Sequence, residues 1–328
     1  MKNRVQLFLA LTCICLLTVT ASAQKIDRVI FFGDSLSDAG NHFIYSNGAS
    51  SRQPFSFEPP DASYDIGGHH FSNGNTWAEQ LATSLHVPNS GNPSLRAPGT
   101  FTDYAMGRAR ARANAPSFPQ FDLSSQVNQF LSDFGGQVPA NSLVVIWIGG
   151  NDIDDALTAL FVDPSGQTSA GIVQSAATAV ATNVQTLYGA GARMFLIVNV
   201  PDLAKTPYVQ FLGANVNPGI PAIATLFTGY YNGGLNQLAS GFPFLAPPDP
   251  VHPLRYVRLL DANALFDQIR ATPVTFGISN SIERCTQAGV VGGGICSTPN
   301  RYLFWDGIHP TTTVHSAVAT AALQLVTQ

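Results

Sequence analysis

The chain has 328 residues, of which 45% are hydrophobic and 11% charged, and its formal net charge is −4. This composition excludes an intrinsically disordered protein, because the apolar content is sufficient for a large core. Lys and Arg together number 16 against 20 for Asp and Glu, so the chain has no basic excess of the kind that binds nucleic acid. We therefore expect a globular protein with no nucleic-acid partner.

The first segment, Met1–Ala23, has the pattern of a secretory signal peptide. Two basic residues precede an apolar run, Leu7–Val19, and Ala21–Ala23 fits a cleavage site of small residues. An uncleaved membrane anchor is the alternative, but the run is shorter than the roughly 20 residues that a spanning helix needs. We expect a secreted or periplasmic protein whose mature chain has no transmembrane segment.

Apolar runs rich in β-branched residues alternate with helical patterns after the leader, which is typical of an α/β domain built on a parallel sheet. The expected strands are Arg28–Phe32, Thr102–Met106, Leu143–Ile148, Met194–Val198 and Tyr256–Leu260. The expected helices are Thr76–Leu85, Ser125–Ser132, Ser169–Tyr188, Ile220–Leu238 and Thr311–Val326. No linker divides the chain, so we expect one domain, residues 24–328, with long loops at 43–75, 203–218 and 240–253.

The first expected strand ends in Gly33-Asp34-Ser35-Leu36, which places a serine at the carboxyl end of the strand. Ligands of open α/β sheets bind at this edge, so Ser35 is a candidate nucleophile. A helix N-cap is the alternative role for a serine in this position.

Two further strands end in glycine turns, and these turns predict hydrogen-bond donors at the same edge. Gly107 follows the second expected strand, and we expect its backbone N–H to face the pocket of Ser35. Asn151 follows the third strand, and its side-chain amide can donate to an anionic oxygen. Together with the backbone N–H of Ser35, these groups would form an oxyanion hole with three donors.

Three clusters of charged or imidazole side chains near these turns have simpler interpretations. Three arginines alternate along an extended segment, namely Arg108, Arg110 and Arg112. We expect them to form a solvated edge, and the alternative is that they bind an anionic head group. We expect the following carboxylates to cap and charge the first turn of a helix; they are Asp152, Asp154 and Asp155. We expect solvated loop histidines, and no metal site, at His42, His69 and His70.

Four cysteines are present, and Cys13 and Cys15 belong to the leader. The other two, Cys285 and Cys296, flank a glycine-rich loop. An even number of cysteines in an exported protein favours a disulfide between this pair, and two unpaired thiols are the alternative.

Near the C-terminus, Asp306 stands three residues before His309. An Asp in this relation can orient the imidazole and stabilise the imidazolium that forms when His takes a proton from a serine. A second pair with the same spacing, Asp249 and His252, precedes the last expected strand and therefore lies at the opposite edge of the sheet from Ser35. We therefore select Asp306 and His309 as the partners of Ser35.

The segments that contain Ser35, Gly107, Asn151 and the pair Asp306 and His309 resemble, in this order, the four sequence blocks of the SGNH superfamily of GDSL-type esterases and lipases. Phe32–Asp38 matches the first block, and Phe71–Gly74 with Trp77 is similar to a stretch of the bacterial lipase/phospholipase-like branch. The resemblance covers nearly all of the chain from Ile30 onward. It implies a three-layer α/β/α flavodoxin-like fold with a five-stranded parallel sheet in the order 2-1-3-4-5, distinct from the α/β-hydrolases.

The resemblance also implies a role for each candidate residue. Ser35 would be the nucleophile, His309 the base and Asp306 its orienter, while Ser35, Gly107 and Asn151 would hold the oxyanion. The chain departs from the family pattern at Arg108, where a small residue usually follows the glycine of the second block.

We therefore predict a serine esterase or lipase that hydrolyses carboxylic esters through an acyl-enzyme, without a metal or a cofactor. The expected substrates are short- to medium-chain acyl esters, with lipid and choline esters as candidates. Three alternatives remain open at this point: acyl transfer to an alcohol or sterol, hydrolysis of carbohydrate esters, and a binding protein that keeps the fold without turnover.

Overall fold

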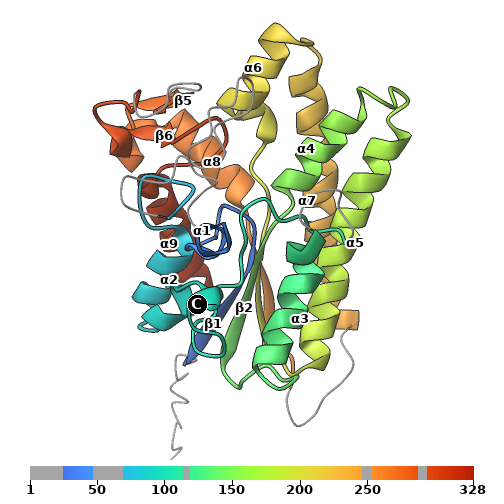
Figure 1. The fold of residues 1–328 in the computed structure, drawn as a ribbon, viewed down its shortest axis with the longest axis vertical. Coiled ribbons are helices and arrows are strands. Elements are labelled where there is room, and N and C mark those ends of the chain that lie inside the picture. The colour runs from blue at the N-terminus through green and yellow to red at the C-terminus, as the bar shows by residue number, and fades with distance from the viewer. Residues whose placement is uncertain (1–24, 47–68, 114–118, 246–252, 287–293) are drawn as a thin grey trace, which may run out of the picture.

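The structure is a computed structural model that describes residues 25–46, 69–113, 119–245, 253–286 and 294–328 (Figure 1). The expected leader, Met1–Ala23, lies outside these residues. None of the helices within them is long and apolar enough to cross a membrane.

A parallel sheet of four strands forms the centre of the molecule. Its strands are β1 (Arg28–Gly33), β2 (Ser142–Trp147), β3 (Met194–Val198) and β4 (Tyr256–Leu260), and they pair in the order β1-β2-β3-β4. The first three strands are almost wholly buried, because helices cover both faces of the sheet and the sequence is apolar without alternation. Four of the five expected strands are thereby confirmed.

The fifth expected strand, Thr102–Met106, is wrong as a strand, although it lies beside β1 where the expected strand order puts it. Thr102 O accepts a hydrogen bond from Phe31 N–H (3.0 Å), and Tyr104 N–H donates to Phe31 O (2.8 Å). The next bond of a parallel ladder would use Gly33 N–H, which donates instead to the side chain of Gln126 (2.9 Å), although Met106 N–H then donates to Gly33 O (3.1 Å). The pairing is therefore interrupted at Gly33 and amounts to an isolated bridge between Phe31 and Asp103 rather than a strand.

Helices pack on both faces of the sheet and complete three layers (Figure 1). One face is covered by α3 (Leu123–Asp133), α4 (Gly150–Ala159), α5 (Gln167–Gly189) and α7 (Ile220–Leu245). The other face is covered by α2 (Trp77–Ser84), α8 (Ala262–Ala271) and α9 (Thr312–Thr327). Alternate residues of each strand enter the two cores, as in Ile30 and Phe31 of β1. The predicted three-layer α/β/α architecture is confirmed.

Several elements have no counterpart among the expected ones. These are α1 (Asn41–Tyr45), α6 (Pro207–Asn215), α8 and a small parallel sheet of β5 (Asn280–Arg284) and β6 (Tyr302–Phe304). Helix α6 lies in the loop expected at 203–218. The side chain of Thr206 accepts a hydrogen bond from Val209 N–H and Pro207 opens the helix, which is a local start signal.

The expected disulfide between Cys285 and Cys296 is present, with the two Cα atoms 4.9 Å apart. It follows β5 directly, and Cys285 N–H donates to Phe304 O of β6 (3.0 Å). The crosslink therefore stabilises the segment that leads into Asp306 and His309.

Candidate active site

Ser35 lies at the carboxyl edge of the sheet, two residues beyond the end of β1. A Cβ atom at Gly33 would come within 2.5 Å of Trp147 O, so only glycine allows β1 and β2 to approach this closely. Gln126 of α3 binds both the N–H and the C=O of Gly33 (2.9 and 2.8 Å), and the carboxylate of Asp34 accepts from Leu36 N–H (3.0 Å). These bonds fix the turn that carries Ser35.

The structure brings Ser35, His309 and Asp306 together across 274 positions of sequence. His309 Nε2 lies 2.8 Å from Ser35 Oγ, and His309 Nδ1 lies 2.7 Å from Asp306 Oδ2. All three residues are buried, and Asp306 has no exposed surface. This arrangement allows the imidazole to take a proton from the hydroxyl while the carboxylate stabilises the resulting positive charge.

Asp306 also shapes the loop that carries His309. Its Oδ1 atom accepts hydrogen bonds from the backbone N–H groups of Ile308 and His309, each at 2.8 Å. Trp305 N–H donates to His309 O (2.8 Å) and closes the loop. One carboxylate therefore sets both the loop conformation and the orientation of the imidazole.

The Phe-Ser-Asn segment that begins at Phe71 holds the same loop from the other side. The ring of Phe71 packs on the ring of His309, with 5.2 Å between their centroids. Ser72 Oγ donates to Pro310 O (2.9 Å), and the side-chain oxygen of Asn73 accepts from Thr312 N–H at the start of α9 (2.9 Å). This stretch of the sequence thus positions His309.

The expectation that Gly107 N–H faces the pocket of Ser35 is wrong, because this group donates to Asp38 Oδ2 (2.7 Å). Gly107 is also absent from the residues that line the cavity above Ser35. The position still requires glycine. A Cβ atom there would lie 2.3 Å from Phe71 Cζ and 3.2 Å from His42 Cβ.

Asp38 joins two of the sequence blocks. Besides the N–H of Gly107, its carboxylate accepts the backbone N–H groups of Gly40 (2.7 Å), Asn41 (2.6 Å) and His42 (3.1 Å) at the start of α1. Burial raises the pKa of Asp38 to about 6, while the backbone donors pull it down. The side chain of Asn41 continues the link by donating to two carbonyls of the 102–106 segment.

Asn151 lies in the first turn of α4 and lines the cavity. Its Nδ2 atom donates one hydrogen to Ala109 O (2.9 Å), and a primary amide has a second hydrogen to donate. Gly149, just before α4, has a φ of 122° and would place a Cβ atom 2.3 Å from Tyr231 Cζ. Position 149 therefore requires glycine, because of its positive φ and because Tyr231 packs against it. This close packing fixes the start of α4.

The alternating arginines do not form the solvated edge that the sequence suggested. Arg110 makes a bidentate pair with Asp155 (3.0 and 2.9 Å), and Arg112 binds Asp152 (2.7 Å) and Asp155 (2.5 Å). The side chains of both arginines are only 12% exposed. Burial raises the pKa of Asp155, but the two guanidinium groups outweigh this effect and lower it. The cluster fastens residues 108–112 to α4.

Two of the three histidines expected to be solvated are buried, and the third, His69, is half-buried. His42 and His70 are each only 4% exposed, and His70 Nε2 lies 2.9 Å from Glu79 Oε2. Burial lowers the pKa of His42 to about 4. Across the described parts of the chain, no group of three or more His, Cys, Asp or Glu side chains could hold a metal ion.

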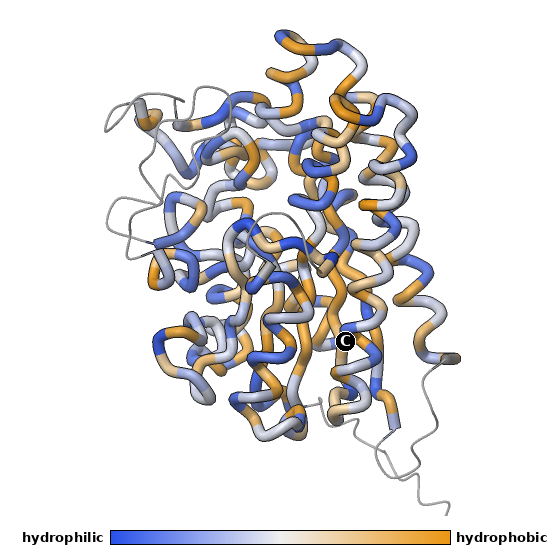
Figure 2. The backbone as a smooth tube through the Cα atoms, turned by 45° about the vertical axis from the view of Figure 1, so that its right-hand side comes forward, coloured by the Kyte–Doolittle hydropathy of each residue, from blue (hydrophilic) through white to orange (hydrophobic). Residues whose placement is uncertain are grey.

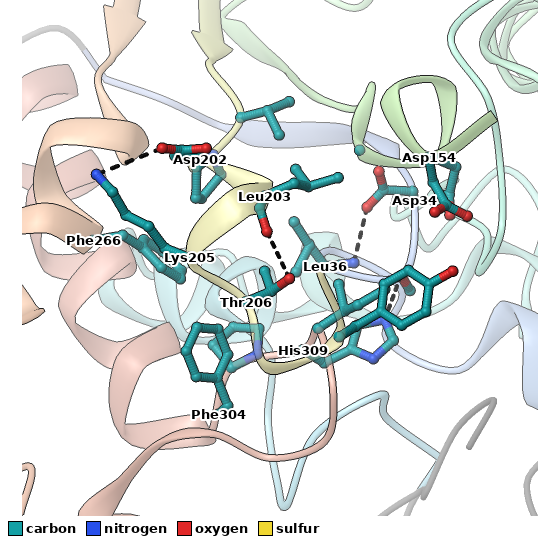
Figure 3. A pocket seen from close by; sticks show the side chains of 18 of the residues that line it. Asp34, Leu36, Asp154, Asp202, Leu203, Lys205, Thr206, Phe266, Phe304 and His309 are labelled. Carbon is teal, nitrogen blue, oxygen red and sulfur yellow. Dashed lines mark hydrogen bonds and ion pairs between the residues drawn. The ribbon is translucent and has the colours of Figure 1, made fainter. Parts of the chain in front are cut away.

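A cavity of about 300 Å³ opens above Ser35 (Figure 3). Polar groups surround the hydroxyl at one end, namely Asp34, Asn151 and His309. Apolar side chains also line the cavity, namely Leu36, Val200, Leu203, Phe266 and Phe304. In Figure 3, Asp202 and Lys205 lie on the side away from Asp34. Lys205 Nζ lies 2.5 Å from Asp267 Oδ1 and 3.7 Å from Asp202 Oδ2, so this ammonium group is paired with both carboxylates.

The competing pair, Asp249 and His252, lies outside the described residues. The strand that follows it, β4, runs parallel to β1. The start of β4 is therefore at the opposite edge of the sheet from Ser35, as expected.

Sequence comparison gives the family. The profile of the GDSL-like Lipase/Acylhydrolase family matches residues 29–322. The chain belongs to this family. The predicted GDSL-type esterase and lipase family is thereby confirmed, and all of the candidate site residues of this GDSL-like chain lie within the matched range.

Relatives of this GDSL-like protein include both lipases and an acyltransferase. Lipase 1 of Photorhabdus luminescens is 25% identical over 92% of this chain and 50% of its own length. Phosphatidylcholine-sterol acyltransferase of Aeromonas hydrophila is 24% identical over 97% of this chain and 96% of its own length. The chain thus spans half the length of the first relative and nearly the whole of the second.

Among solved structures, the GDSL-like chain is similar to a catalytic mutant of Axe2, an acetylxylan esterase from Geobacillus stearothermophilus. The two are 13% identical, the match covers 92% of this chain and 94% of that one, and the TM-score is 0.46.

Proposed function

We propose that this protein is a secreted or periplasmic serine esterase or lipase that hydrolyses carboxylic esters, with Ser35 as nucleophile, His309 as base and Asp306 as its orienter. The observation that supports this proposal is the pair of short contacts at His309, 2.8 Å to Ser35 Oγ and 2.7 Å to Asp306 Oδ2, beneath the cavity. Family membership points to the same chemistry.

The reaction proceeds in two steps through an acyl-enzyme. Ser35 Oγ attacks the ester carbonyl while its proton passes to His309 Nε2, and Asp306 stabilises the imidazolium. His309 then gives this proton to the departing alkoxide, and the alcohol leaves. A water molecule, deprotonated by the same imidazole, attacks the acyl-enzyme, and the proton returns to Ser35 as the acid is released.

The anionic oxygen of each tetrahedral intermediate needs donors beside Ser35. We assign this role to the backbone N–H of Ser35 and to the second hydrogen of Asn151 Nδ2. Arg108 lines the cavity with a φ of 69°, and we propose its backbone N–H as the third donor in place of Gly107. The loss of one donor of this kind typically costs about 10²- to 10³-fold in kcat.

Three variants test the triad with a soluble short-chain aryl ester. Ser35→Ala and His309→Ala should each lower kcat by at least about 10⁴-fold, and Asp306→Asn by a similar factor, because the remaining binding groups give only residual catalysis. His252→Ala, from the competing pair, is the matched control and should keep full activity. Full activity in His309→Ala, or a loss in folded His252→Ala equal to that in His309→Ala, would refute the assignment.

Covalent labelling separates an enzyme from a binding protein on the same fold. A fluorophosphonate should attach to the wild-type protein at Ser35 and fail to attach to Ser35→Ala. An unlabelled but folded wild-type protein would favour the binding protein, because such a reagent reports an activated serine rather than the fold.

Acyl transfer to an alcohol is the second candidate, and the match over nearly the full length of the Aeromonas hydrophila acyltransferase favours it. The two functions share the acyl-enzyme and differ only in the acceptor. Product analysis with added short-chain alcohols or a sterol distinguishes them, because transfer yields a new ester at the expense of free acid. A substrate panel of aryl esters of increasing chain length, phospholipids, choline esters and acetylated sugars defines the acyl and head-group preference.

Export is proposed on two grounds, the leader pattern of Met1–Ala23 and the disulfide between Cys285 and Cys296. Residues 24–328 would form one mature domain. Mass spectrometry of the protein recovered from the periplasm and medium checks export and cleavage, because the mature chain should begin at Gln24.

A further inference from the structure

Two segments at the ends of helices, on one end of the molecule, expose large apolar side chains. The first is the turn after α4, which exposes Phe161 (62%) and Val162 (89%). The second is the α6–α7 hairpin, which exposes Phe211 (40%), Val216 (51%) and Leu226 (49%). Both lie at the end that is uppermost in Figure 1, beyond the carboxyl edge of the sheet, and we call them the two apolar tips.

Both tips belong to helices that begin at the cavity. The first turn of α4 lines the cavity through Gly150, Asn151 and Asp154, and the first turn of α6 lines it through Tyr208. At 1.5 Å per residue, α4 places its tip about 15 Å and α6 about 14 Å beyond the cavity wall. The two apolar tips therefore project on the cavity side of the molecule by nearly equal distances.

The α6–α7 hairpin is also free of charge. From Thr206 to Pro248 the sequence contains no Asp, Glu, Lys, Arg or His. Helix α5 is equally uncharged, yet no large apolar side chain on it is exposed, so the absence of charge does not by itself account for the exposure at the tips. Figure 2 shows orange stretches alternating with blue at the tip of the hairpin, where the polar residues are asparagines.

The hairpin is rigid enough to hold these side chains in place. A Cβ atom at Gly213 would lie 2.7 Å from Pro221 Cγ, which shows how closely α6 packs on α7. The hydroxyl of Thr225 in α7 donates to Asp202 of the cavity wall (3.1 and 3.0 Å), so α7 is tied to the cavity as well. Tyr230, one helical turn below Leu226 on the same face, is 64% exposed and suits a polar–apolar boundary.

We propose that the two apolar tips dock the protein on the surface of a zwitterionic lipid bilayer and thereby deliver lipid esters to the cavity, which rests on the esterase function proposed above. Tips that enter the head-group region by about 5–10 Å bring the cavity wall to within about 5–10 Å of the surface. The hairpin supplies no cation to attract anionic lipid, and the carboxylate of Asp163 and the net charge of −4 repel it.

The test is co-flotation of the Ser35→Ala protein with phosphatidylcholine vesicles, using residues 24–328 so that the apolar run of the leader cannot itself bind lipid. This variant leaves the vesicle esters intact. Val162→Glu and Leu226→Glu, one in each tip, should each lower the partition coefficient by about tenfold or more. The matched control is Phe244→Glu, which introduces the same charge at an 89% exposed position of α7 about 27 Å from Leu226. The control should partition like the parent protein.

Two further measurements make the outcome decisive. Replacing a third of the phosphatidylcholine by phosphatidylserine should weaken binding, and raising the salt concentration should not abolish binding to phosphatidylcholine. In the active background, both tip variants should hydrolyse a soluble aryl ester at the parent rate and vesicle esters at least tenfold more slowly. Circular dichroism confirms that each variant is folded.

Docking is refuted if the parent protein does not float, if Val162→Glu and Leu226→Glu float as well as Phe244→Glu, or if phosphatidylserine strengthens binding. A different result, in which the parent floats but the active protein hydrolyses no soluble ester, contradicts the proposed function and leaves docking intact.

Discussion

The free-energy cost of burying a carboxylate beside Ser35 can be measured at Asp34. This residue is 2% exposed, and burial is the main cause that raises its pKa from 3.8 to about 7; the Leu36 N–H bond and His309 oppose the shift. In the unfolded chain the carboxyl keeps its ordinary pKa. Between pH 4 and 7 the folded protein therefore holds a proton that the unfolded chain has released.

The sign of the effect follows from this difference. The stabilising contribution of the protonated Asp34 is complete below pH 4 and is lost as the pH rises toward 7, at about 1.4 kcal/mol per pH unit. From pH 5 to pH 8 the loss is about 3 kcal/mol, because the native carboxyl releases its proton near pH 7. Asp34→Asn removes the titration, and its side-chain oxygen can still accept the hydrogen bond from Leu36 N–H.

The assay is urea unfolding at pH 5, 6, 7 and 8, followed by the fluorescence of the three tryptophans, all of which are buried. Relative to the wild type, Asp34→Asn should become more stable by about 3 kcal/mol as the pH rises from 5 to 8. The control is Asp163→Asn, an exposed carboxylate whose pKa is lowered by hydrogen bonds from Ser165 and Thr168. Its stabilising effect is lost only in acid, so this variant should keep the wild-type slope.

Parallel stability curves for the wild type and Asp34→Asn across this range would contradict the reasoning. Such a result would mean that Asp34 remains ionised in the folded protein and that the nearby donors and cations outweigh burial.

Three further variants probe the surroundings of the site. Gly107→Ala should cost about 1–3 kcal/mol in unfolding free energy and lower kcat, because the added methyl displaces Phe71; unchanged kinetics would show that this packing does not reach the imidazole. Arg108→Gly should retain kcat/KM and be up to about 1 kcal/mol more stable, since its φ of 69° favours glycine; a tenfold loss of kcat/KM would assign a role to the guanidinium. Replacing Cys285 and Cys296 together by Ser should lower the free energy of unfolding, measured with urea, by about 3 kcal/mol. If the crosslink is responsible, the reduced wild type and the variant should be equally stable.

The sequence predicts the parts of the fold whose cause is local. Strands β1 to β3 are continuous apolar runs because helices bury both of their faces, and their ends agree with the expected ones to within a residue or two. The positions of two candidate site residues could be predicted from the strands. Ser35 and Asn151 lie two and four residues beyond the ends of β1 and β2, and the carboxyl ends of parallel strands meet at one edge.

Other features depend on contacts between residues far apart in the chain. Gln126 interrupts the pairing of β1 with the 102–106 segment from a position 93 residues away from Gly33, and nothing in its own helix marks it for this role. The bonds of Asn41 to the 102–106 segment span more than 60 residues. Helix α8 is different, because Asp261 accepts from Ala264 N–H as an N-cap, and this local signal could have predicted the helix.

The same edge of the sheet shows why its loops keep a fixed shape without a regular ladder. Backbone N–H groups there donate to buried carboxylates: four to Asp38, two to Asp103, two to Asp152 and two to Asp306. Each carboxylate has two oxygens with several acceptor sites, so a single side chain can hold two chain segments that no strand connects.

This device has a cost, because burial raises the pKa of Asp34, Asp38, Asp103 and Asp152 together. The ionised site is therefore less stable than a site built from apolar side chains would be, and the deficit grows as the pH rises. An apolar core cannot present fixed backbone groups to a substrate, whereas carboxylate-held turns can. The concentration of buried acids around Ser35 is thus the physical consequence of placing a preorganised polar site on loops rather than on the sheet itself.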